Sequence, residues 1–186
     1  MKEFLNQIHP VADATLEAYL SHWKPYSVSK KTVMTAEGET ERHMYYVQEG
    51  IQKAFHFDGR KERIVAFTYP PSFTGVLDSF LTQSPSTCYL ETITDSRFLR
   101  LSFEKHQQLM EQHRPIETLF RKATEKFLVG IMHRYYELMA FDMETRFRAF
   151  AARSPHLLHM VSQKDLASYL RIDATNLSKL LGSVKI

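Results

Sequence analysis

The chain has 186 residues, enough for one large domain or two small ones, and its composition, 44% hydrophobic and 24% charged, is that of a globular protein. No apolar run approaches the roughly 20 residues that a membrane span needs, and the single cysteine, Cys88, excludes an internal disulfide. The net charge of +3 is too small to indicate a nucleic-acid partner by itself, although the excess lies in residues 141–186, which carry seven basic and four acidic residues.

The first 23 residues predict a short helical lead-in. Apolar residues recur there at helical spacing, and Pro10 interrupts them. The segment also carries Glu3, Asp13 and Glu17 and lacks the cleavage site of a signal peptide. Together with the single cysteine, this predicts a cytoplasmic protein with no membrane partner.

Residues 25–101 alternate between short runs of apolar and polar residues and groups of turn formers, which is typical of β-strands. Asp58-Gly59 stands between two such runs and predicts a hairpin with a type I′ turn, which requires positive φ at both central residues. Several short strands about ten residues apart predict a small antiparallel barrel or jelly roll, because a parallel sheet would need helices between them.

Helical periodicity follows the last strand, which is expected at residues 97–101. Ser102 predicts a helix start, and after Pro115 an apolar stripe continues for about 25 residues. The stripe comprises Ile116, Leu119, Phe120, Ala123, Phe127, Ile131, Tyr135, Leu138 and Met139. Packing against the barrel could account for it, but its length and a second apolar edge at Leu128 and Met132 favour a partner helix. We therefore expect a homodimer with five residues in the interface: Phe120, Phe127, Ile131, Tyr135 and Leu138.

Residues 142–181 predict three helical runs with short breaks between them. Pro155 makes the first break, and Ser162 and Asp173 stand at N-cap positions ahead of the second and third runs. The tight connection at Arg171-Ile172 is typical of a helix-turn-helix. Glycine is usual in such a turn, but a residue with a Cβ can adopt the left-handed conformation at a cost of about 1 kcal/mol.

The outer face of the last helix is short, polar and nearly free of acids, which suits a helix entering the major groove of DNA. Its residues are Ala174, Thr175, Asn176, Ser178 and Lys179. A helical bundle end with a purely structural role is the alternative interpretation of these three runs.

The order of the elements resembles the Crp/Fnr superfamily of bacterial regulators. In the first half the similar segments are Gly38-Glu39, residues 46–50, the Asp58-Gly59 hairpin, and residues 85–87 and 89–91. In the second half they are residues 144–147, 154–155, 166–170 and 176–179, which look like a branch common in Bacteroidetes.

An α+β protein in three parts is therefore expected. Residues 1–114 form the jelly-roll sensor domain, residues 115–140 the dimerisation helix, and residues 141–186 the helix-turn-helix domain. The resemblance implies a transcription regulator that senses a small effector and has a double-stranded DNA operator and RNA polymerase as partners.

The expected effector pocket comprises Gly75, Val76, Leu77, Ser86 and Thr87. Cyclic-nucleotide binders have an acid that holds the ribose where this chain has Val76, and an arginine that pairs the phosphate where it has Ser86. A buried cyclic phosphate without that arginine would lose a charge-assisted contact and remain largely uncompensated. We therefore expect an effector other than cyclic AMP, and no other cofactor.

The chain ends five residues after Leu181, so we expect it to lack most of the β-hairpin wing that some relatives carry. Contacts with DNA phosphates are then expected from Gln163 and Lys164 at a helix N-terminus and from Lys185, and Ser162 is also expected to contact DNA. The unusual Arg171 and the missing wing leave an alternative function open, a small-molecule sensor or interaction module with a degenerate DNA-binding end.

An enzyme is a further alternative, because jelly-roll barrels also carry metal-dependent chemistry. Such a site needs two or three histidines and a carboxylate around one metal, whereas His43 and His56 are isolated in the strand region. The sequence has no Gly-x-Ser-x-Gly and no glycine-rich phosphate loop. We predict no catalytic residue and no metal site.

Overall fold

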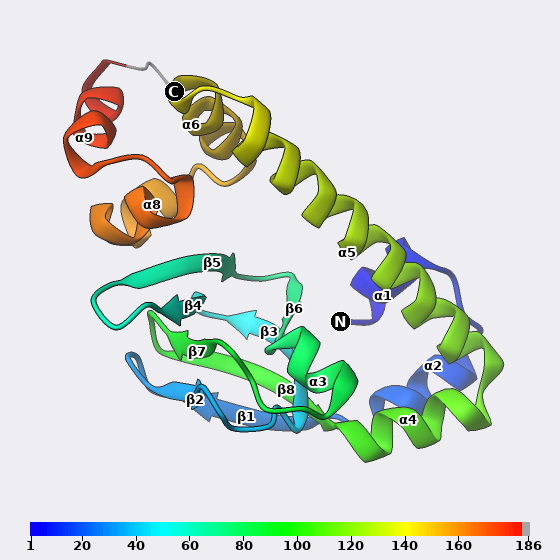
Figure 1. Cartoon of the computed structure of the whole chain (residues 1–186). Coiled ribbons are helices and arrows are strands. Elements are labelled where there is room, and N and C mark those ends of the chain that lie inside the picture. Colours follow the sequence, from blue (N-terminus) through cyan, green and yellow to red (C-terminus); the bar gives the residue numbers. More distant parts are fainter. Residues whose placement is uncertain (184–186) are drawn as a thin grey trace.

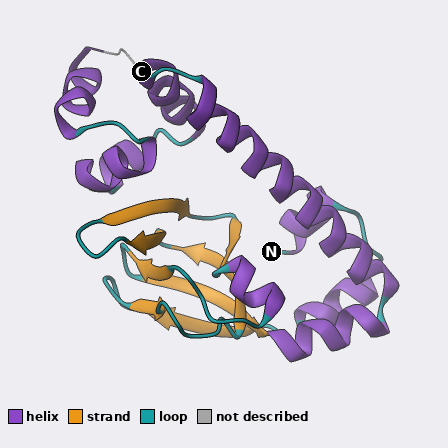
Figure 2. Ribbon diagram, in the orientation of Figure 1, coloured by secondary structure: helices purple, strands orange, loops and turns teal. Residues whose placement is uncertain are grey.

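The computed structural model describes residues 1–183 and consists of a β-barrel joined by a long helix to a small helical end (Figure 1, Figure 2). Two short helices, α1 (Lys2–Ile8) and α2 (Asp13–Leu20), precede the barrel. The break between them includes Pro10, as the sequence predicts, because proline has no N–H to continue the helical hydrogen bonds.

Two four-stranded antiparallel sheets form the barrel, which confirms the predicted jelly-roll architecture. One sheet has the order β1-β8-β3-β6 and the other the order β2-β7-β4-β5. The strands are β1 (Lys24–Val28), β2 (Val33–Thr35), β3 (His43–Glu49), β4 (Gln52–Phe57), β5 (Glu62–Thr68), β6 (Ser72–Thr74), β7 (Tyr89–Thr92) and β8 (Ser96–Ser102). A short helix, α3 (Leu77–Thr82), lies between β6 and β7, at the expected effector pocket.

The β4–β5 hairpin is present, but the predicted type I′ turn is wrong. Four residues, from Asp58 to Lys61, connect the strands, and of these Gly59 has a positive φ of 83° whereas Asp58 does not. The Asp58 carboxylate accepts hydrogen bonds from the backbone N–H groups of Arg60 at 3.0 Å and Lys61 at 2.9 Å. The aspartate side chain thus closes a longer turn that does not need positive φ at both central residues.

Helices α1, α2 and α4 (Phe103–Gln112) pack with the start of α5 (Arg114–Ala140) against one side of the barrel. Leu5, Leu16, Ile116 and Leu119 are fully buried in this core. Ser102 caps α4 as predicted, because its side chain accepts a hydrogen bond from the backbone N–H of Lys105 at 3.3 Å. The base of the long helix is therefore fixed firmly to the barrel.

Beyond this base, α5 runs from the barrel to the C-terminal helices (Figure 1). Pro115 lies in its first turn, where the missing N–H is not needed. The buried residues of this 27-residue helix are Ile116, Leu119, Phe120 and Glu137, so the stretch between Phe120 and Glu137 contains none. Within residues 1–183 no helix is both long enough and apolar enough to cross a membrane.

The C-terminal part consists of α6 (Met143–Arg153), α7 (Leu157–Met160), α8 (Gln163–Leu170) and α9 (Ala174–Ser183). Single-turn α7 is not among the three predicted runs. Both predicted N-caps are confirmed, because Ser162 accepts from the backbone N–H of Asp165 at 3.1 Å and Asp173 from that of Asn176 at 2.9 Å. Arg171 has φ 55° and ψ 44°, the left-handed conformation that the turn requires.

Candidate DNA-binding helices and effector pocket

Helix α9 exposes most of the face that the sequence predicts to contact DNA. Leu177 is fully buried in the C-terminal core, which fixes the rotation of the helix about its axis. The exposed residues on the opposite side are Ala174, Thr175, Ser178 and Lys179. These short side chains and one lysine form a surface without acids that the major groove can accommodate.

Asn176, the remaining predicted residue of this face, is partly withdrawn. Its side chain is half-buried, and its amide nitrogen donates a hydrogen bond to the Asp173 carboxylate, which also caps the helix. The amide would have to leave Asp173 before it could pair with an adenine edge. Lys179, the other predicted base-reading donor, is exposed.

The start of α8 carries three further residues predicted to contact DNA. Ser162, Gln163 and Lys164 are all exposed, and the N-terminal N–H groups of a helix favour anions. Ala167 is 7% exposed, and its carbonyl accepts from the backbone N–H of Ile172 at 3.0 Å, where a small side chain lets the turn close. Lys185, the third predicted phosphate contact, lies outside the described residues.

Helix α8 is also packed against strand β5 of the barrel, a contact that the sequence does not predict (Figure 1). The Ser168 hydroxyl accepts a hydrogen bond from the backbone N–H of Ile64 at 3.0 Å and donates one to the carbonyl of Glu62 at 2.9 Å. Nearby, the rings of Phe67 and Tyr169 lie 5.1 Å apart. The helix-turn-helix is therefore docked on the barrel in this conformation.

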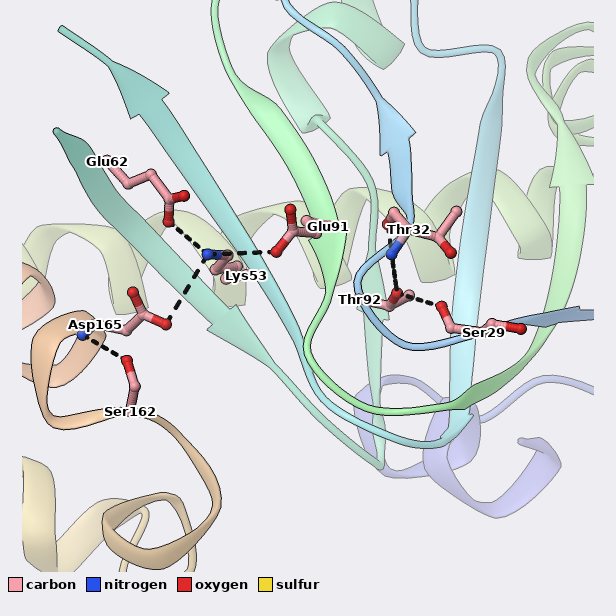
Figure 3. Close-up of polar contacts among 8 residues, drawn as sticks. All are labelled: Ser29, Thr32, Lys53, Glu62, Glu91, Thr92, Ser162 and Asp165. Atoms are coloured by element: carbon pink, nitrogen blue, oxygen red, sulfur yellow. Dashed lines mark hydrogen bonds and ion pairs between the residues drawn. The ribbon is translucent and has the colours of Figure 1, made fainter. Parts of the chain in front are cut away.

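A buried lysine joins the two parts at this contact (Figure 3). Lys53, on β4, is 7% exposed, and its Nζ lies 2.5 Å from Glu62, 3.3 Å from Glu91 and 3.9 Å from Asp165 of α8. Burial lowers the pKa of Lys53, but the hydrogen bond to Glu62 and the three negative charges outweigh burial and raise it. The lysine therefore stays charged and holds carboxylates from the barrel and from α8 together.

Helix α5 contacts the C-terminal helices through a second charged group. Glu137 is 8% exposed and pairs with Arg153 of α6 at 2.7 Å and with Arg134 at 3.4 Å. Burial raises the pKa of Glu137, and the two arginines lower it by more. The guanidinium of Arg134 also lies 4.0 Å from the ring centre of Tyr169, so α5 and α8 are linked directly.

The expected effector pocket corresponds in part to a cavity of about 190 Å³ between the barrel, α3 and α5. Gly75 and Leu77 line it, whereas Val76, Ser86 and Thr87 are not among its lining residues. Val76 and Ser86 are buried, and the Ser86 hydroxyl donates to the carbonyl of Cys88 at 2.6 Å. Thr87 is exposed on the surface. Two of the five predicted residues are thus brought to the cavity.

The sequence gives no signal for Glu41, which occupies the N-terminal end of α3. It is 2% exposed, and its carboxylate accepts hydrogen bonds from the Thr35 hydroxyl at 2.6 Å and from the backbone N–H groups of His43 at 3.1 Å and Val76 at 3.4 Å. Burial raises the pKa of Glu41, although these hydrogen bonds oppose the rise. The chain's own acid thus uses the backbone donor that an anionic ligand would need.

The predicted dimer contacts on α5 fall into two groups. Phe120 is 8% exposed and packs inside its own chain, and Leu138 is half-buried. Phe127, Ile131 and Tyr135 are 52%, 47% and 53% exposed. Further exposed apolar or aromatic residues on the same helix are Leu128, Val129, Met132, Tyr136 and Met139.

The two strand histidines do not form a common site. His43 lies on β3 and lines the cavity, whereas His56 lies on β4 in the other sheet, where its Nδ1 is 2.9 Å from the carbonyl of Thr87. Among the described residues, no three histidine, cysteine, aspartate or glutamate side chains gather in a way that could hold a metal.

Comparison with known proteins identifies the barrel. Residues 26–113 match the cyclic nucleotide-binding domain family. Over 103 residues the chain is 26% identical to the cAMP-activated global transcriptional regulator CRP of Salmonella typhimurium and to that of Klebsiella aerogenes, which covers 55% of this chain and 49% of each relative. The matched segment thus spans about half the length of these curated relatives.

Three solved structures have a similar fold over most of the chain. FixK2 from Bradyrhizobium japonicum has a TM-score of 0.74 and 15% identity, covering 86% of this chain and 83% of that one. The c-di-GMP responsive global regulator CLP of Xanthomonas campestris has a TM-score of 0.68 and 20% identity, covering 92% and 90%. Thermus thermophilus catabolite activator protein has a TM-score of 0.60 and 19% identity, covering 95% and 84%. None of these matches bears on the Bacteroidetes branch, which stays a prediction. The chain therefore joins a domain of the cyclic nucleotide-binding type to the overall fold of the Crp/Fnr regulators, as its sequence resemblance implies.

Proposed function

We propose that the protein is a dimeric, DNA-binding transcription regulator whose activity responds to a small effector other than cyclic AMP. The observation that carries the proposal is the surface of α9, where a capped helix presents short polar side chains and Lys179 to solvent. The fold shared with known regulators supports a regulatory protein rather than an enzyme. Its proposed partners are a double-stranded DNA operator and RNA polymerase, and its proposed location is the cytoplasm.

We assign a separate role to each of three segments: residues 1–114 are the proposed sensor domain, residues 115–140 the proposed dimerisation helix and residues 141–186 the proposed DNA-binding domain. The exposed apolar surface of α5 supports the second assignment, because such a surface is stabilised when a partner helix covers it. In a two-fold dimer, the two copies of α9 should contact successive major grooves about 34 Å apart. The operator is then an inverted repeat.

The proposal is tested by selecting genomic fragments that bind the protein and measuring affinity for the selected site and for random DNA. Lys179→Ala is expected to weaken binding to the selected site by about 1–3 kcal/mol and to change binding to random DNA little, as for a residue that reads a base edge. Lys30→Ala, an exposed lysine on the barrel, is the control and should bind like the parent protein.

Three results would contradict this proposal. A loss that is equal on both DNAs would make Lys179 a phosphate contact. If Asn176→Ala and Lys179→Ala both leave binding unchanged, α9 does not read DNA. Affinity that lacks a steep dependence on salt concentration would favour the alternative, a sensor or interaction module with a degenerate DNA-binding end, because phosphate contacts impose that dependence.

Cyclic AMP and cyclic GMP are expected to bind weakly or not at all. Ser86 supplies no guanidinium for the phosphate, and the Glu41 carboxylate already accepts from the Val76 N–H and would repel an anion there. Isothermal titration calorimetry with each nucleotide should give no saturable heat at micromolar concentrations. Micromolar affinity for either nucleotide would contradict the prediction.

A further inference from the structure

The cavity between the barrel and α5 has a floor of small and apolar side chains. Ala54 on β4 and Ala66 on β5 are paired in the sheet register, and Leu90 on β7 is the neighbour of Ala54 on its other side. Two alanines side by side leave the volume that larger core residues would fill. Leu77 and Phe80 of α3 close another side of the same cavity.

The threonine hydroxyls of the residues that line the cavity are already engaged in hydrogen bonds. The Thr68 hydroxyl is 2.8 Å from the Thr74 hydroxyl and 3.2 Å from the side-chain carbonyl of Gln52, and the Thr124 hydroxyl donates to the carbonyl of Phe120 at 3.0 Å. Burial and the charge of Arg100 lower the pKa of His43, which is therefore neutral at pH 7.

The wall of the cavity also carries no charge that could pair with a charged ligand. Among the described residues that line it there is no lysine, arginine, aspartate or glutamate. The Glu41 carboxylate lies close to Gly75 but is bound at the start of α3 and is not part of the lining. Transfer of a charged ligand into such a site would be costly, because burial of an unpaired charge is strongly unfavourable.

We propose that this cavity binds a neutral, apolar small molecule, and that this molecule is the effector, a role that rests on the regulatory function proposed above. A cavity of about 150 Å³ with an apolar lining binds benzene in another protein. At about 190 Å³, the cavity here has room for a single aromatic ring with a short substituent. Toluene is therefore a suitable probe, and benzoate, which replaces the methyl group by a carboxylate, is its charged counterpart.

The cavity lies where a bound ligand can influence how the protein binds DNA. Helix α5 supplies Phe120, Ala123 and Phe127 to its wall, and Phe127 is 52% exposed on the proposed dimer surface. A ligand that packs against Phe127 would contact both the barrel and the dimerisation helix. The ligand can therefore favour one arrangement of the barrel and α5 over another, since a ligand shifts a conformational equilibrium by its difference in affinity for the two conformations.

Binding is tested first, without DNA, by NMR titration and thermal melting of the full chain. Toluene is expected to bind saturably and to raise the unfolding midpoint, whereas benzoate at equal concentration is not. Ala66→Leu, from the floor, and Ala123→Leu, from α5, should each weaken toluene binding at least about tenfold, because the added side chain occupies the cavity. Ala18→Leu, on the exposed face of α2, adds the same atoms elsewhere and should bind toluene like the parent protein.

Melting of each variant without ligand checks that it is folded, and two filling variants on different elements guard against failure of one. The proposal is overturned if toluene does not bind, if benzoate binds as well, or if toluene binding survives both filling variants. Operator binding is then measured with and without toluene, with an expected change of at least about fivefold. An unchanged operator affinity overturns the effector role. Failure to bind any DNA would refute the regulatory function while leaving the ligand site established.

Discussion

A Phe127→Glu, Ile131→Glu variant is expected to be monomeric and to lose most of its operator binding. Both side chains are about half exposed on α5, the long helix that leaves the barrel. A two-fold interface brings the same residues of both copies together, so the variant would place four carboxylates in an apolar contact. A monomer engages one half-site at a time, which should lower operator affinity by about 100- to 10,000-fold.

The oligomeric state is measured by size-exclusion chromatography with light scattering, and operator binding by titration at fixed salt. His133→Glu is the matched control, since His133 is exposed on the same helix but, at 100° per residue, lies about 120° around the axis from Phe127 and about 160° from Ile131. It should remain a dimer. Ile131→Glu with Tyr135→Glu should also give monomers and does not alter the cavity, to which Phe127 belongs. A dimer of unchanged mass in both double variants would move the interface away from this part of α5.

Lys53→Met is expected to destabilise the protein by about 3 kcal/mol and to loosen α8 from the barrel. Removal of one partner from a buried ion pair leaves the remaining charges uncompensated, and here Glu62, Glu91 and Asp165 would be left facing one another. Methionine is about as long as lysine, so the loss of stability reflects the removal of the charge more than a loss of packing. The measurement is urea unfolding together with hydrogen exchange of the Ile64 amide, whose hydrogen bond to Ser168 depends on the docked helix.

Arg97→Met provides the comparison for this result. Arg97 pairs with Glu49 across β8 and β3, but both side chains are more than half exposed, so this pair should contribute less than about 1 kcal/mol. If Lys53→Met is no less stable than Arg97→Met, or if exchange at Ile64 is unchanged, the lysine does not hold α8 to the barrel.

The features predicted correctly from the sequence are those that depend on neighbouring residues. Three helices are capped by the side chains of Ser102, Ser162 and Asp173, each of which accepts from the backbone N–H three residues further on. Arg171 adopts the left-handed conformation because the connection between α8 and α9 is short. The type I′ turn also depends on neighbouring residues, yet its prediction is wrong, because the Asp58 carboxylate competes with the backbone for the turn's N–H groups.

Features that depend on distant residues could not be predicted. Lys53 and Glu41 stand in runs of mixed polarity, where a charged residue usually faces solvent, and their burial follows from partners that the fold brings to them. Of the residues predicted for the effector pocket, Gly75 and Leu77 line the cavity, but its apolar character comes from Ala54, Ala66 and α5 rather than from Val76 or Ser86. In each case the sequence shows one residue of the contact but not which distant residues the fold places against it.

The docking of α8 on β5 has a consequence for the solubility of the protein. Strand β5 is the last strand of its sheet, so one side of its backbone has no neighbouring strand, and Ser168 satisfies two of its groups, the N–H of Ile64 and the carbonyl of Glu62. Uncovered edge strands pair readily with other chains and lead to aggregation. Helix α8 therefore shields the barrel from self-association along β5, and a conformation that frees the helix-turn-helix from the barrel would expose that edge.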